Sequence, residues 1–241
     1  MKNSKKILIA ITVVIGLLFI LPFMIPLQTY LHQAEKIARE KLGQPITIGS
    51  AHALLMPSPR LIFSDIVVGA HQELKVTNLV VIPTIGSLFS DTKIIDLNIS
   101  KPEVKKAAFD FVAALKTSNN SSSSFKIRLI KIEGLQLLWP NVQLSDTKFP
   151  IINADATLTN ANALEQVNMR TVDGKLNAVV TPNDDEHLIV VSESKWTLPA
   201  GLPLLINKAA VQMHLKGSRL TISNMDIALY GGKLKGNAVV S

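Results

Sequence analysis

Residues 211–216 read Val-Gln-Met-His-Leu-Lys, a strict alternation of apolar and polar side chains. Successive side chains of a β-strand point to opposite faces of the sheet, so this stretch predicts a strand with one apolar and one wet face. The same period of two recurs, less strictly, over residues 74–76, 95–99 and 176–180. Sheets with one wet face are usually antiparallel. We therefore predict a mainly β protein.

Turn-forming residues separate the predicted strands at regular intervals. In the second half of the chain they occur at residues 133–134, 139–141, 173–174, 182–185, 216–218 and 230–232. Several of these sites bound runs of about eight to twelve residues, the spacing typical of a meandering β structure. Short helices are expected near residues 84–89 and over residues 103–116. Residues 117–124 are all small and polar, which predicts a flexible linker.

The N-terminus carries the strongest local signal. Residues 7–27 contain no charged side chain, and at ~1.5 Å rise per residue a helix over them would span about 31 Å, the thickness of a bilayer core. A cleaved signal peptide is the alternative, but residues 22–30 offer no small-x-small cleavage site. Lys2, Lys5 and Lys6 precede the run, and the positive-inside rule keeps that end in the cytoplasm. We predict an uncleaved single-pass anchor with an exported body.

Residues 28–42 read as an amphipathic helix. Apolar side chains recur there at spacings of three and four, Gly43 is placed as a C-terminal cap, and Pro45 prevents continuation. The polar face is not strongly cationic, which disfavours a helix lying along the membrane surface. We expect instead a helix that covers the end of the sheet.

Composition and motifs exclude several classes of function. The net charge of +7 includes three N-terminal lysines, and the remainder is too diffuse for nucleic-acid binding. Cysteine is absent, which excludes disulfides, zinc thiolate sites and a cysteine nucleophile. The five histidines are scattered without metal-ligand spacing. Residues 231–233, Gly-Gly-Lys, lack the rest of a phosphate loop and predict a turn. We predict no enzyme, no cofactor and no metal, although a dispersed catalytic site stays an alternative.

Several phrases of the sequence, in order after an anchor and a short helix, resemble the AsmA family of bacterial envelope proteins. They are Pro-Ile-Thr-Ile-Gly at residues 45–49, the segments at 59–68 and 82–89, a strand followed by proline at 94–104, and a Tyr-Gly-Gly-Lys hairpin within 228–236. The resemblance covers most of the chain, which is shorter than most members and is similar to a short or truncated one. TamB-like proteins belong to the same group.

This resemblance implies both a fold and a function. It implies an inner-membrane anchor, a periplasmic body and an elongated, curved, taco-shaped antiparallel sheet with an apolar inner face. Such a groove would bind or conduct phospholipid acyl chains between the inner and outer membranes, each shielded methylene contributing about 0.8 kcal/mol. The expected partners are acyl chains, the inner membrane and outer-membrane or other envelope proteins. The predicted groove residues are Val76, Ile95, Leu97, Ile99, Leu176, Val180, Val211, Met213, Leu215, Leu220, Ile222 and Leu229.

A second interpretation remains open. The same alternation would build a closed β-sandwich with a dry core, as expected for a secretion or assembly component similar to type II secretion protein N. An accessible apolar face would favour lipid transport, whereas a closed sandwich would favour assembly. The predicted organisation is a cytoplasmic tail (1–6), a transmembrane helix (7–27), a helix with an N-terminal β module (28–116), a linker (117–124) and a C-terminal β module (125–241).

Overall fold

The computed structural model describes residues 31–32, 35–36, 39–40, 43–87, 90–108, 125–138, 149–159, 161–183, 186–197, 205–217 and 219–240. The predicted tail, anchor and linker at residues 1–6, 7–27 and 117–124 lie outside these ranges. Within them, no helix combines the length and the apolar character needed to cross a bilayer.

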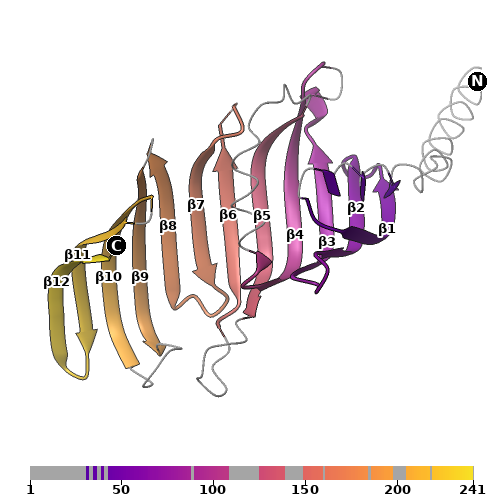
Figure 1. The fold of residues 1–241 in the computed structure, drawn as a ribbon. Coiled ribbons are helices and arrows are strands. Elements are labelled where there is room, and N and C mark those ends of the chain that lie inside the picture. The colour runs from indigo at the N-terminus through magenta and orange to yellow at the C-terminus, as the bar shows by residue number, and fades with distance from the viewer. Residues whose placement is uncertain are drawn as a thin grey trace, which may run out of the picture.

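The described residues form twelve strands in a single open sheet, which confirms the mainly β prediction. Each strand pairs with its neighbours in the chain, so the spatial order is the sequence order. Figure 1 shows one twisted layer that runs from β1, drawn in indigo, to β12, drawn in yellow. The strands are β1 (Ile46–Leu54), β2 (Arg60–Val68), β3 (Leu74–Pro83), β4 (Lys93–Lys105), β5 (Phe125–Leu138), β6 (Ile152–Leu158), β7 (Leu164–Thr171), β8 (Leu176–Asn183), β9 (Glu186–Thr197), β10 (Leu205–Lys216), β11 (Arg219–Leu229) and β12 (Gly232–Val240).

One pair departs from the antiparallel prediction. β4 and β5 run parallel, from Lys93 opposite Phe125 to Lys105 opposite Leu138, while every other neighbouring pair is antiparallel. A parallel return needs a crossover of a dozen or more residues, and the connection over 106–124 is long enough. The sheet therefore continues across the junction between the two predicted β modules.

Three local predictions need correction. Glu103, Val104 and Lys105 belong to β4 and not to a helix, because Glu103 and Val104 pair with residues of β3. The helix expected near 84–89 is a single 3-10 turn, η1 (Ile85–Ser87). The turn expected at 133–134 is wrong, since Gly134 lies inside β5 with φ +75°. For Glu103–Lys105 and Gly134, cross-strand pairing overrides the local pattern.

The predicted amphipathic helix lies at the β1 edge of the sheet. Its described residues are helical, and Glu35 Oε1 accepts a hydrogen bond of 2.8 Å from the backbone N–H of Ile48 in β1. Gly43 ends the helix with φ +63° and donates to the carbonyl of Arg39 at 2.9 Å, as the cap prediction requires. The hydrogen bond from Ile48 to Glu35 supplies an acceptor to β1, an edge strand that would otherwise expose unpaired backbone groups.

Pairing register places apolar side chains from all twelve strands on one face, which we call the apolar face. Directly opposed residues in neighbouring strands point to the same side of a sheet. One row of such residues crosses the whole sheet and has no polar member; we call it the apolar row. It consists of Ala53, Leu61, Val81, Leu97, Ile130, Ala156, Val167, Val180, Ile189, Met213, Ile222 and Ala238.

The opposite face of the sheet is mixed. The row beside the apolar row, one residue along most of the strands, consists of His52, Ile62, Val80, Asn98, Lys131, Asp155, Asn168, Val179, Val190, Gln212 and Asn224. More than half of these side chains are polar or charged. The two faces of the sheet therefore differ: the mixed face is suited to contact with water, and the apolar face is suited to contact with aliphatic groups.

Residues with positive φ keep the apolar face continuous across the first strands. Asp65, Lys101 and Gly134 have φ values of 54°, 48° and 75° inside β2, β4 and β5. A left-handed residue reverses the side-chain alternation of a strand, so apolar residues spaced by three, rather than two, stay on one face. Accordingly Phe63, three residues before Ile66, packs against the same buried cluster.

Candidate functional site

All twelve predicted groove residues lie on the apolar face. Leu97, Val180, Met213 and Ile222 are members of the apolar row itself, and the other eight occupy parallel rows on the same side. Leu215 and Leu220, for example, are directly opposed across the β10–β11 hairpin. The structure thus places on one face side chains that are up to 153 positions apart in the chain, from Val76 to Leu229.

Over most of its extent, the apolar face is covered by no element of the described ranges. Eleven of the twelve predicted residues are half-buried, shielded by neighbours in the sheet. Wherever the structure describes the chain, the extensive contacts between elements are those between neighbouring strands, and no second layer of strands covers this face. A ligand that covered the face would therefore remove aliphatic surface from water.

Val76 is the exception among the predicted groove residues. Its side chain is 8% exposed and packs with Ile46, Ile66 and Val68, the buried cluster of the sheet. This cluster sits at the end of β1–β4 where β2 finishes and β3 begins. Val76 is closed to a ligand here, so this corner of the apolar face is a conventional dry core.

The opposite end of the same four strands is hollow. A pocket of about 310 Å³ opens there. Leu61, Val81 and Ile95 of the apolar face line it together with Arg60 and Lys93. The remaining lining residues are Ala53, Leu54, Leu55, Pro59 and Pro83. Sequence reasoning missed this pocket because its residues come from four different strands and from the β1–β2 connection.

One carboxylate interrupts the apolar face. Glu193 of β9 lies opposite Leu176 and Ala209 and is only 7% exposed. No hydrogen-bond partner reaches its Oε1 from any described residue. Burial among aliphatic side chains raises the pKa of this carboxyl, since desolvation disfavours the charged form. The sequence could have predicted this carboxylate on the apolar face, because Ile189, Val191 and Glu193 are spaced by two along one strand.

Replacement of Glu193 by glutamine should stabilise the protein in a pH-dependent way. Because the pKa of Glu193 is raised in the folded state, its proton binds more tightly there than in the unfolded chain, and stability falls as the pH rises through the folded-state pKa. Glu193→Gln should therefore melt above wild type at pH 7. The difference should shrink below about pH 4, where the unfolded-state carboxyl is protonated as well.

Thermal melting followed by circular dichroism at several pH values measures this effect. Glu165→Gln is the matched control, because Glu165 is an exposed residue of β7. Equal shifts for Glu193→Gln and Glu165→Gln at all pH values would refute the argument from burial.

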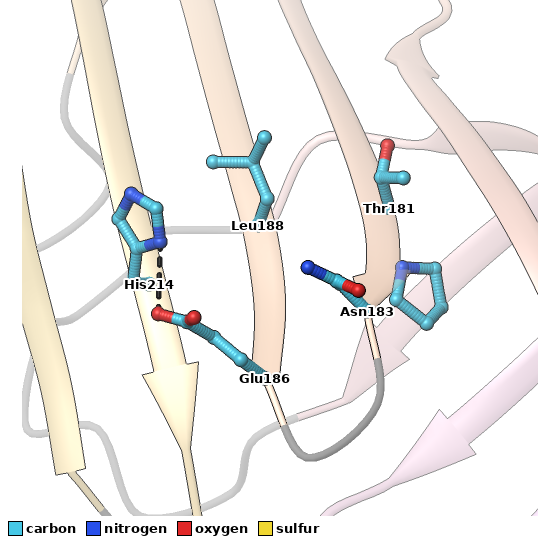
Figure 2. A pocket seen from close by; sticks show the side chains of 6 residues that line it. Thr181, Asn183, Glu186, Leu188 and His214 are labelled. Carbon is cyan, nitrogen blue, oxygen red and sulfur yellow. Dashed lines mark ion pairs between the residues drawn. The ribbon is translucent and has the colours of Figure 1, made fainter.

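A second pocket, lined by several polar side chains, lies on the opposite face of the sheet. His214 Nδ1 and Glu186 Oε1 are 2.9 Å apart, and Figure 2 shows the two side chains pointing toward one another beside Thr181 and Asn183. The pocket encloses about 340 Å³. Glu186 follows the turn predicted at residues 182–185, and its partner comes from the next strand. In the part of the chain that the structure describes, no three metal-ligating side chains gather.

The apolar face extends over all twelve strands, and we take it as the candidate functional site. A scan against models of known protein families and a search of curated proteins found no match to this chain. Aliphatic side chains supply no acid, base or nucleophile, but they stabilise aliphatic ligands by excluding water.

Proposed function

We propose that this chain is an inner-membrane-anchored, periplasmic protein of the AsmA type that binds or conducts phospholipid acyl chains between the inner and outer membranes. The observation that carries the proposal is the apolar row, twelve directly opposed apolar residues that cross an open sheet without interruption. The mixed opposite face would keep the other side of the sheet in water, while a lipid would lie along the apolar face as along a curved groove.

The free energies of transferring an acyl chain from water favour a conduit over a storage site. An acyl chain of about fifteen methylenes, half shielded by the sheet, gains on the order of 6 kcal/mol relative to water. In a bilayer the same chain is shielded fully and gains about twice as much. A lipid on the sheet would then lie between water and membrane in free energy, so it could enter from one membrane and leave into another.

The alternative function is assembly, with a closed sandwich. That architecture needs a second sheet over the apolar face. The single open layer of described strands favours the lipid proposal instead.

Photocrosslinking tests the proposal with a matched pair of valines. Val191 lies on the apolar face opposite Ala178 and Val211, whereas Val190 lies on the opposite face and is 42% exposed. A photoreactive side chain at position 191 should crosslink to lipid in native membranes, and one at position 190 should not. Mass spectrometry of the adducts identifies the lipid. Equal labelling at both positions, or wild-type protein that carries no lipid, would count against the proposal.

A further inference from the structure

Glu193 places a carboxyl group among the side chains that a lipid on the apolar face would cover. It lies directly opposite Leu176 of β8 and Ala209 of β10. Its diagonal neighbours on these two strands are Ala178 and Val211. The side chain is 7% exposed, and no described residue donates a hydrogen bond to its Oε1. Aliphatic side chains thus surround an ionisable group that no described residue pairs with.

The charged side chains of the adjoining segments do not neutralise Glu193. Lys175, at the start of β8, forms an ion pair of 3.4 Å with Asp173. Lys208 directly precedes a residue that faces Glu193, so its own side chain points to the opposite face. Lys195 of β9 is exposed, and no ion pair among the described residues includes Glu193. Burial therefore acts on this carboxyl group without a compensating charge, and it raises the pKa.

A lipid on the apolar face would shift the protonation of Glu193 further. The described strands form a single layer, so solvent lies just beyond the side chains of this face. An acyl chain would replace that solvent with hydrocarbon beside the carboxyl group. Loss of nearby water raises the free energy of a carboxylate steeply and that of a neutral carboxylic acid only slightly. A bound lipid therefore favours the protonated form, and by linkage the protonated form binds lipid more tightly.

We propose that Glu193 couples lipid binding to proton uptake: the apolar face binds an acyl chain together with a proton from solvent, which forms the O–H bond of a neutral carboxylic acid, and it releases both together. The inference rests on the proposed function, because the lipid on the apolar face is the ligand that Glu193 regulates. Lipid affinity is then highest at low pH. It falls as the pH rises through the pKa of Glu193 in the lipid-free protein and levels off above the higher pKa of the lipid-bound protein.

The test follows lipid affinity across a range of pH. Purified full-length protein in nonionic detergent is titrated with phosphatidylcholine that carries a fluorescent acyl chain, because the headgroup of this lipid keeps its charge in that range. The affinity of wild type should fall about tenfold or more between about pH 5 and 8, since each unit by which lipid raises the pKa of Glu193 is a factor of ten. Glu193→Gln should bind with one affinity throughout. Glu165→Gln, at an exposed position of β7, should behave like wild type.

Proton uptake is measured separately, from the binding enthalpy of wild type in buffers that differ in ionisation enthalpy. Wild type should take up protons on binding lipid, and Glu193→Gln should not. His187, which lies on the apolar face opposite Leu215, would give the opposite pH dependence, because its charged form exists at low pH and a lipid covering it would bind less well there.

The outcomes separate this inference from the proposed function. Melting curves establish that each variant is folded. An equal pH dependence of wild type and Glu193→Gln overturns the coupling, and so does lipid binding by wild type without proton uptake. In both cases lipid still binds, and the proposed function stands. Lipid that binds neither protein at any pH overturns the proposed function and the coupling together.

Discussion

The Met213→Asp variant is expected to fold with nearly the melting temperature of wild type and to lose its bound lipid. Met213 lies in the apolar row between Ile189 and Ile222, and it is only half-buried. A carboxylate there stays partly hydrated, so the folded state does not bear the full cost of desolvation. A lipid lying on the row would bury that charge, and binding would weaken strongly.

Two measurements on the same sample decide the outcome. The melting transition reports folding, and lipid extracted from the purified variant reports binding. Gln212→Asp places the same carboxylate on the neighbouring residue of the opposite face and should change neither. An unfolded Met213→Asp would indicate that the face is covered, as in a sandwich. A folded variant with wild-type lipid would show that the ligand does not pass this row.

Local sequence patterns predicted what depends on local physics. The period of two located the strands, and the glycines at 174, 217 and 231 adopt positive φ in the turns after β7, β10 and β11, as predicted. Parity alone predicted a common face for Val211, Met213 and Leu215 on one strand and for Leu220 and Ile222 on the next, because side chains alternate along a strand. The same reasoning could have found Glu193, which shares its parity with Ile189 and Val191.

Local sequence patterns could not predict features that depend on how distant strands pair. The parallel pairing of β4 and β5 turned Glu103–Lys105 from a predicted helix into strand, since ladder hydrogen bonds with β3 outweigh a weak helical pattern. The pocket lined by Leu61, Val81 and Ile95 combines residues of β1–β4 with residues of the 55–59 connection, so no single strand's pattern predicts it. The open single layer likewise follows from which strands pair, not from any strand's own sequence.

Val76→Asp should give the opposite result to Met213→Asp, although both residues lie on the apolar face and were predicted to line the groove. Val76 is 8% exposed and packs among Ile46, Ile66 and Val68. An unpaired carboxylate in such a cluster costs several kcal/mol, a large part of the roughly 5–15 kcal/mol that stabilises a typical domain. We expect the variant to unfold or to fail to accumulate.

Thr77→Asp provides the comparison, because Thr77 is the next residue of β3 and its side chain is exposed. That variant should express and melt like wild type, as measured by soluble yield and circular dichroism. If Val76→Asp were folded with an unchanged transition, the corner at Val68 and Val76 would be accessible and the dry core assigned there would be wrong. If Val76→Asp and Met213→Asp both unfolded, the whole face would behave as a core. Divergent results would show that burial, and not position on the face, separates the residues that hold the sheet together from those left free for a lipid.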